Sequence, residues 1–146
     1  MKHSILLLAF AVGCSGDEED GDTTPIEEYA CVHIVEGDIV DVAASRDLAS
    51  EITPGRAPYR VNLLQDQVGF LRFQADGGPL VLLTDFAGAT PAVWTGETRE
   101  ELPAGNANPN CDEDIPSVQD LDLAAGEHFL ELGPVFQANV WLMLGS

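Results

Sequence analysis

The sequence predicts an all-β protein, an antiparallel β-sandwich of about seven to nine strands with a jelly-roll-like arrangement and one disulfide. Short segments rich in β-branched and aromatic residues recur at intervals of about ten residues, and Gly and Pro separate them. Several segments alternate apolar and polar residues, which is typical of strands that bury one face. Two facing sheets are the arrangement that buries many such faces in one core.

The N-terminus predicts export and a membrane anchor. Lys2 and His3 precede an apolar run at 5–12, which is too short to span a bilayer but fits the h-region of a signal peptide. The run ends in Ala-Val-Gly-Cys at 11–14, which resembles the lipobox of bacterial lipoproteins. The resemblance implies cleavage before Cys14, a diacylglyceryl group on its thiol and acylation of the new amino terminus. An ordinary secretory signal with a chance cysteine is the alternative.

The same resemblance implies a place in the cell envelope and a partner, the membrane, reached through the lipid anchor. Ser15 is not the Asp that resembles an inner-membrane retention signal, so we expect the outer membrane of a Gram-negative bacterium, with the domain facing the periplasm or the surface. Residues 1–13 then form the signal peptide, 14–26 an acidic flexible tether and 27–146 one domain. The tether's carboxylates could bind calcium, but the EF-hand spacing is absent, which favours a solvated spacer.

The charge of the chain excludes one class of partner. It carries 25 acidic and six basic side chains, for a formal net charge of −19 at pH 7. Such a surface repels nucleic acid and anionic lipid headgroups. It could attract cations or basic partners, but acidity alone mostly indicates solubility, and that interpretation is preferred.

The cysteines agree with export. With Cys14 acylated, Cys31 and Cys111 remain as a pair outside the cytoplasm, and we expect them to form a disulfide. Closing the loop between Cys31 and Cys111 gives a stabilisation of about 4 to 5 kcal/mol in the chain-entropy model. The alternative makes Cys31 a copper or zinc ligand together with His33, since two such positions share a face on a strand.

The first half of the domain predicts three strands and one short helix. Segment 29–35 is rich in β-branched and aromatic residues, which favours a first strand, and 39–42 favours a second. Segment 45–51 is the candidate helix, ended by Thr-Pro-Gly. Segment 59–63 has the clearest alternation in the chain.

The middle of the chain predicts three further strands and a long loop. Segment 68–75 alternates, and Asp-Gly-Gly at 76–78 indicates a hairpin turn. Segment 79–84 is apolar on both faces, as expected of an interior strand covered on both sides. A short strand at 92–95 is followed by a polar loop at 96–114, which is functional or mobile.

The last third predicts three strands, at 118–123, 127–132 and 138–144. Parity within all these strands places one set of large apolar residues in a shared core between the sheets. The set is Leu71, Phe73, Leu82, Leu121, Leu130 and Leu142.

Three segments, 68–73, 80–83 and 121–132, resemble the pre-peptidase C-terminal type of β-sandwich. That family has a strand ending in an Arg/Lys-Phe-like step, followed by an apolar strand and a late hairpin that closes the sheet. In this chain, His128 stands in the hairpin where the family usually has Tyr. The start at 31–33 and the later Cys111 also resemble a group of small bacterial lipoproteins of no assigned function. The resemblance implies an accessory module and no catalytic residues.

Motifs that would indicate catalysis are missing. The sequence has no Gly-x-Ser-x-Gly elbow, no His-Glu-x-x-His and no phosphate-binding loop. Asp112, Glu113 and Asp114 form either a weak calcium site or a solvated loop, and the loop is preferred because nothing else converges on it. His128 shares parity with two leucines, so we expect it to face the core with hydrogen-bonded ring nitrogens.

The positions of the two tryptophans would distinguish between two classes of function. Trp94 and Trp141 are expected in the core, and exposure of both on one face would favour carbohydrate binding. We therefore expect an exported, lipid-anchored, non-catalytic β-sandwich with a structural or protein-binding role. The alternative is an accessory module that binds carbohydrate or a metal ion, and an enzyme is the third class. No catalytic residues and no cofactor are expected; His33, Asp112, Glu113 and Asp114 are the candidate metal ligands.

Overall fold

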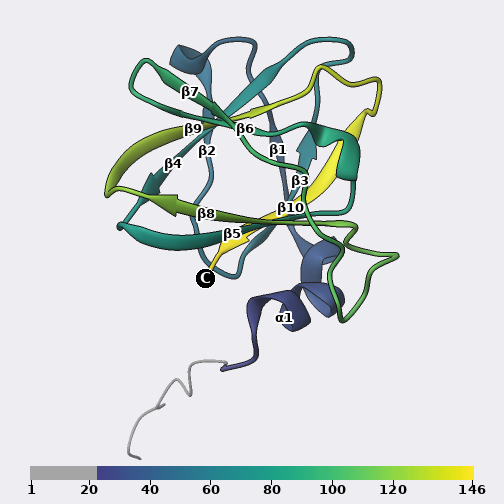
Figure 1. Cartoon of the computed structure of the whole chain (residues 1–146). Helices are drawn as coiled ribbons and strands as arrows, with labels where there is room; N and C mark the ends of the chain where they lie inside the picture. Colours follow the sequence, from purple (N-terminus) through teal and green to yellow (C-terminus); the bar gives the residue numbers. More distant parts are fainter. Residues whose placement is uncertain (1–22) are drawn as a thin grey trace, which may run out of the picture.

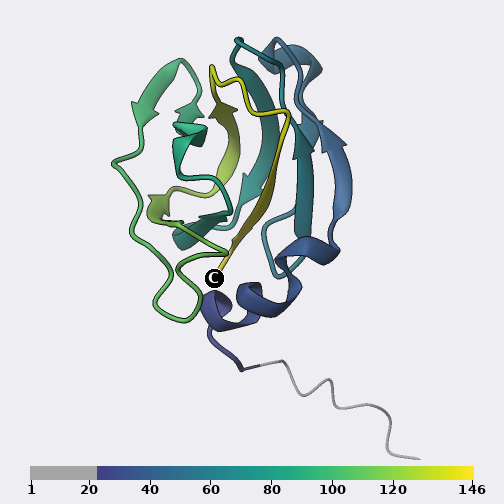
Figure 2. The same cartoon turned by 90° about the vertical axis from the view of Figure 1, so that its right-hand side faces the viewer.

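The computed structural model describes residues 23–146. The predicted signal peptide, Cys14 and most of the predicted tether lie outside the described residues. The described chain forms two facing five-stranded sheets, drawn in two orientations in Figures 1 and 2. The all-β sandwich expected from the sequence is confirmed.

The first sheet has the strand order β1-β3-β10-β5-β8. Its strands are β1 (Asp38–Asp41), β3 (Pro58–Asn62), β10 (Asn139–Gly145), β5 (Gly78–Thr84) and β8 (Ser117–Leu123). The edge strand β1 pairs with β3 in parallel, and the other neighbours are antiparallel. The predicted interior strand at 79–84 is β5, which lies between β10 and β8.

The second sheet has the order β2-β4-β9-β6-β7. Its strands are β2 (Ser50–Glu51), β4 (Gly69–Ala75), β9 (Gly126–Leu132), β6 (Ala92–Thr95) and β7 (Thr98–Glu101). Here too the edge pair β2 and β4 is parallel while the remaining pairs are antiparallel. The described chain thus has ten named strands, one more than the upper limit of the expected range. The sequence does not predict β2 and β7 as strands, because neither has an alternating apolar pattern.

The core lies between the sheets and contains the predicted set. All six residues named from parity belong to one buried cluster, and each is at most 5% exposed. Side chains on the opposite faces of the same strands point outward, as the period of two requires. The cluster includes Leu71, Phe73, Leu82, Leu121, Leu130 and Leu142.

The turn at 76–78 was expected to close a hairpin, and this prediction is wrong. Gly77 and Gly78 have φ angles of +95° and +99°, which suits glycine, so the turn itself is present. It connects β4 to β5, however, and these strands belong to different sheets. Both strands bury a face in the common core instead of pairing with each other.

The segment predicted as a first strand is a helix. α1 (Ile26–His33) continues into the short 3-10 helix η1 (Ile34–Glu36), and Figure 1 shows α1 at the end of the sandwich near the C-terminus. Ile26, Ala30 and Ile34 are spaced by four residues and are all buried. They form a second cluster on the outer surface of β5 and β10, with Leu83 and Met143. This packing outweighs the β propensity of the segment.

Two further predictions between the strands are corrected. The expected helix at 45–51 is the 3-10 helix η2 (Arg46–Leu48) followed by β2, because its apolar residues are too few to make a helical face. The expected loop at 96–114 begins with β7, whose four residues are all exposed. A third 3-10 helix, η3 (Ala87–Ala89), connects β5 to β6.

Candidate functional site

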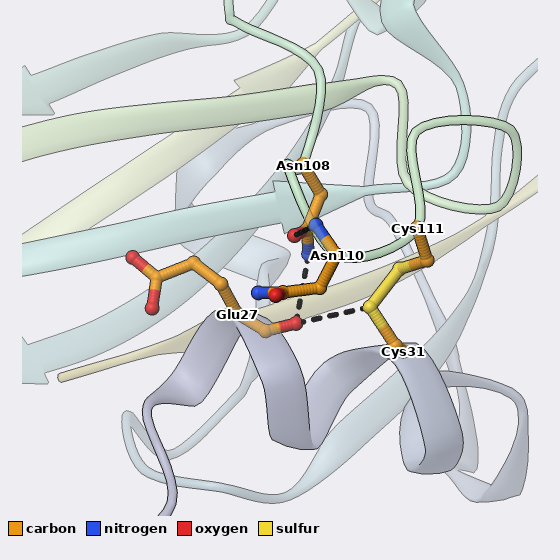
Figure 3. Close-up of a disulfide and its surroundings, with 5 residues drawn as sticks. All are labelled: Glu27, Cys31, Asn108, Asn110 and Cys111. Carbon is orange, nitrogen blue, oxygen red and sulfur yellow. Dashed lines mark hydrogen bonds between the residues drawn. A yellow bond between two sulfur atoms is a disulfide. The ribbon is translucent and has the colours of Figure 1, made fainter.

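The disulfide between Cys31 and Cys111 is present, which confirms the predicted pairing. Its Cα atoms are 5.8 Å apart and the cysteines are separated by 80 residues in sequence. Figure 3 shows that it connects α1 to the loop that precedes β8. It therefore fixes the helix at the point where the described chain begins to fold onto the first sheet.

A buried asparagine reinforces this connection. Asn108 is 0% exposed, and its Nδ2 donates a 2.8 Å hydrogen bond to the carbonyl oxygen of Glu27 on α1 (Figure 3). Its Oδ1 accepts a hydrogen bond from the backbone N–H of Asn110. Cys31 Sγ lies 3.2 Å from the same Glu27 carbonyl, a contact without a proton because the sulfur is in the disulfide. The sequence alone indicates no role for Asn108 beyond the polarity of the loop at 96–114.

A cleft of about 480 Å³ adjoins the disulfide, and we call it the disulfide cleft. Its lining combines an indole ring, three carboxylates and two aliphatic side chains. The residues that line it are Cys31, Ile34, Val35, Asp85, Glu113, Asp114 and Trp141.

Asp85 forms hydrogen bonds to β10, the strand that carries Trp141. Its Oδ1 accepts a 2.8 Å hydrogen bond from the backbone N–H of Trp141, and its own N–H donates to the Trp141 carbonyl oxygen. Burial raises the pKa of the Asp85 carboxyl, and the hydrogen bond from Trp141 acts in the opposite direction. An approaching cation would favour the ionised form of this carboxyl.

The candidate metal ligands are not gathered together. Glu113 and Asp114 line the disulfide cleft, while Asp112 is exposed beside it. His33 pairs with Glu36, with 2.7 Å between Nδ1 and Oε2. The expectation that Cys31 and His33 share a strand face is wrong, because both lie on α1 and the Cys31 thiolate is used in the disulfide. Among residues 23–146, no group of three or more His, Cys, Asp or Glu side chains is arranged to hold a metal ion.

The lining of the disulfide cleft suits an aliphatic cation. The lining residues include no Lys, Arg or His, so the three carboxylates have no cation among them. The guanidinium of Arg60 lies 6.0 Å from the centre of the Trp141 ring, at the outer limit of a cation–π contact. A Lys or Arg side chain would find apolar walls for its methylenes and carboxylates for its charge.

The two tryptophans do not form one aromatic strip. Trp141 alternates on β10 with core residues, so it lies on the outer face of the first sheet and packs against the second cluster. Trp94 alternates on β6 with the core residue Val93, so it lies on the outer face of the other sheet. The guanidinium of Arg46 covers it, at 4.3 Å from the ring centre. Both rings are half-buried, and neither belongs to the core between the sheets.

His128 faces the core, as expected. It is 1% exposed, and its ring lies 5.6 Å from that of Phe73. Nε2 donates to the carbonyl oxygen of Ala124, and Nδ1 lies 2.8 Å from the hydroxyl of Thr95. Both ring nitrogens are therefore satisfied inside the sandwich.

The fold and the cleft define a disulfide-linked β-sandwich with an acidic, aromatic cleft beside its helix. No family model matches the chain, and a search of the curated proteins finds no relative. Among the described residues, no helix has the length and apolar character needed to cross a membrane.

Two solved structures are similar to this chain at a low level. One is PliG of Salmonella Typhimurium, a periplasmic lysozyme inhibitor of g-type lysozyme, with 14% identity and a TM-score of 0.39 over 66% of this chain and 99% of that one. The other is a mutant of the Escherichia coli PliG, with 17% identity and a TM-score of 0.39 over 74% of this chain and 98% of that one. At these values the likeness gives no basis for assigning a ligand.

Proposed function

We propose that this protein is an exported, lipid-anchored and non-catalytic binding domain whose disulfide cleft holds a basic side chain of a protein partner. The observation that carries the proposal is the cleft itself, in which three carboxylates and an indole converge with no cation among the lining residues. Asp85, Glu113 and Trp141 come from three separate parts of the chain.

The rest of the molecule supports a basic partner. The formal net charge of −19 attracts positively charged proteins over a distance and speeds their encounter. The cleft then supplies the short-range contacts that a diffuse surface charge lacks. An aliphatic stem can lie against Ile34 and Val35 while its charged end reaches the carboxylates.

The anchor belongs to the same proposal. The lipobox-like sequence ending in Cys14 and the acidic tether support anchoring of the domain at the outer membrane of a Gram-negative cell. The resemblance to accessory sandwiches of the pre-peptidase C-terminal type is compatible with a binding role. The alternative of carbohydrate binding loses its strongest expected feature, because Trp94 and Trp141 lie on different sheets.

Calorimetric titration with two matched peptides tests the binding proposal. The chain is produced with Cys14→Ser to remove the lipid, and it is titrated with acetyl-Gly-Lys-Gly-amide or with the same peptide carrying norleucine. We expect millimolar affinity for the lysine peptide, at least about fivefold stronger than for the norleucine peptide, from an ion pair worth about 1 kcal/mol.

Carboxylate variants locate the site. The double change Glu113→Gln and Asp114→Asn is expected to remove most of the preference for lysine. Asp112→Asn is the matched control, because Asp112 is adjacent and acidic but does not line the cleft. Equal affinity for the two peptides, or equal losses in the double variant and the control, would contradict the proposal.

A further inference from the structure

A second cleft, which shares no lining residue with the first, lies beside β7 and has a volume of about 410 Å³. We call it the β7 cleft. Arg99, Glu101 and Leu102 form one side, Gln119 on β8 contributes to another, and the turn at 133–134 borders it. Its remaining lining is mostly small or apolar and includes Pro91 and Ala104.

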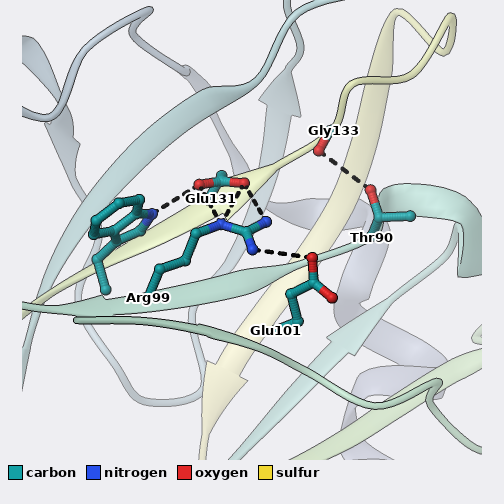
Figure 4. A network of polar contacts seen from close by, with 6 residues as sticks. Thr90, Arg99, Glu101, Glu131 and Gly133 are labelled. Carbon is teal, nitrogen blue, oxygen red and sulfur yellow. Dashed lines mark hydrogen bonds and ion pairs between the residues drawn. The ribbon is translucent and has the colours of Figure 1, made fainter.

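An ion-pair network fixes the wall formed by β7. Glu131 on β9 is 4% exposed and accepts hydrogen bonds from Trp94 Nε1 at 2.7 Å and from Arg99 Nη2 at 2.8 Å (Figure 4). Arg99 Nη1 also pairs with Glu101 Oε1 at 3.0 Å. Hydrogen bonds from Arg99 and Trp94 lower the pKa of Glu131 despite its burial, and the same pairing raises that of Arg99. The network joins β9, β6 and β7 before any ligand is present.

Gln119 has an unsatisfied oxygen. Its side chain is 5% exposed, and Nε2 donates a 2.7 Å hydrogen bond to the carbonyl oxygen of Pro103. This bond fixes the amide orientation, because a flipped amide would place oxygen against oxygen. Oε1 then has no donor among the residues that the structure describes. A buried acceptor without a donor is costly, so it points to a group that is delivered from outside.

Gly105 packs closely against Gln119. A Cβ built at this glycine would lie 2.9 Å from Gln119 Cγ and 2.3 Å from Ser117 Oγ. The backbone at 105 therefore packs directly on the Gln119 side chain, and a larger residue would press into it. Both Gly105 and Gln119 line the β7 cleft.

The free hydrogen-bonding groups of this cleft complement an amide. A guanidinium has five N–H donors, and the hydrogen bonds of Arg99 use three of them, on Nε, Nη1 and Nη2. Arg99 can therefore still donate to a carbonyl oxygen, while Gln119 Oε1, which is buried in the unliganded cleft, can accept from an N–H once the groups that cover it shift. The charges of Arg99 and Glu131 already compensate each other, so a neutral ligand enters without breaking an ion pair.

We propose that the β7 cleft binds an amide group, with its N–H on Gln119 and its carbonyl on Arg99. The apolar lining at Pro91, Leu102 and Pro134 accommodates the aliphatic part of the ligand. The amide is a free carboxamide or the peptide group of a short chain, since both present the same two atoms. This proposal does not depend on the disulfide cleft.

The test compares an amide with its ester. The Cys14→Ser chain, labelled with nitrogen-15, is titrated with isobutyramide or with methyl isobutyrate, which has no N–H donor. We expect saturable shifts of the Gln119 side-chain NH₂ and the Arg99 Nε–H signals with the amide, and at least about tenfold weaker binding of the ester. Acetyl-alanine methylamide, titrated in parallel, distinguishes entry of a peptide group from entry of a free carboxamide alone.

Two variants and one control complete the test. Gln119→Met keeps the side-chain length but removes the acceptor, and it is expected to abolish the preference for the amide over the ester. Gly105→Ala, which presses on Gln119 without removing it, is expected to weaken amide binding. Gln74→Met, on an exposed position of β4, should leave binding unchanged. The proposal is overturned by equal binding of amide and ester, by the absence of saturable shifts with both amides, or by Gln119→Met retaining the preference.

Discussion

At the residue scale, two neighbours on β4 have opposite environments. Phe73 is 0% exposed in the core, while Arg72 lies on the outer face, 3.3 Å from Glu51. Phe73→Ala is expected to lower the free energy of unfolding by about 3 to 5 kcal/mol, because it opens a cavity between the sheets. Arg72→Ala is expected to cost under about 1 kcal/mol, since its ion pair is solvent-exposed. Urea denaturation of both variants measures the difference, and equal losses would contradict the facing of β4.

The pKa of Glu131 predicts a pH dependence. A carboxyl whose pKa is lowered on folding contributes stability that is present above its unfolded value and is lost as the pH falls through the lower folded value. Glu131→Gln removes this contribution. The stability difference between the parent chain and this variant should therefore be constant at neutral pH and shrink as the pH falls below about 4.5. Thermal unfolding between pH 2 and pH 7 provides the measurement, and a difference that grows on acidification would contradict it.

Individual core residues were predictable because each strand carries its own parity. Phe73, Leu82 and Leu130 follow from local alternation, and His128 follows from the parity of the leucines after it. Trp94 and Trp141 were not predictable in the same way. Each lies on an outer face that another element covers, Arg46 in one case and the second cluster in the other. Local sequence shows which positions alternate, but not which outer faces are covered.

At the element scale, α1 depends on its packing and on the disulfide. Reduction of Cys31–Cys111 is expected to lower the melting temperature by at least about 5 °C, because the closed loop restricts the unfolded chain. A Cys31→Ala and Cys111→Ala double variant should show the same loss without added reductant and retain the β-sheet circular dichroism of the sandwich. Peptide mapping without reductant verifies the pairing. An unchanged melting temperature would mean that the helix is held by its buried face alone.

The helix shows why one element was mispredicted. Its residues at 29–35 favour a strand by composition, yet Ile26, Ala30 and Ile34 already had the spacing of a helical face. The predicted tether at 14–26 includes Ile26, so the first of these three positions is missing from the predicted domain. β7 was missed for a different reason, because its four exposed residues show no alternation. Hydrogen bonding to β6 and the Arg99–Glu131 pair place it in the sheet.

At the scale of the whole molecule, the proposed function combines the lipid anchor with the disulfide cleft. Replacing Cys14 by Ser is expected to leave uncleaved precursor or to release soluble protein, because no thiol remains for lipid attachment. Membrane fractionation followed by metabolic labelling with palmitate measures the effect. Cys31→Ala, which leaves Cys14 in place, is the matched control and should remain in the membrane fraction. Unchanged fractionation and labelling of the Cys14 variant would contradict lipid anchoring.

The candidate sites could be predicted from the sequence only in part. The sequence marks Glu113 and Asp114 as candidate metal ligands, but Asp85, which lines the same cleft, is far away in the chain. Asp85 reaches the cleft because its carboxyl is bound to Trp141, 56 residues later. The side-chain oxygen of Gln119 is a candidate acceptor only because folding buries it without a hydrogen-bond donor. Sites of this kind arise where separate strands and loops meet, and no local pattern marks them.

The most direct test of the central claim, that the disulfide cleft binds a basic side chain, is a nitrogen-15 NMR titration with acetyl-Gly-Lys-Gly-amide. The two tryptophans of the chain give two indole N–H signals, and they lie on opposite sheets. The account predicts that the Trp141 indole and the backbone signals of Val35 and Glu113 shift to saturation, while the Trp94 indole does not move. Shifts confined to Trp94, or no saturable shift at Trp141, would contradict it.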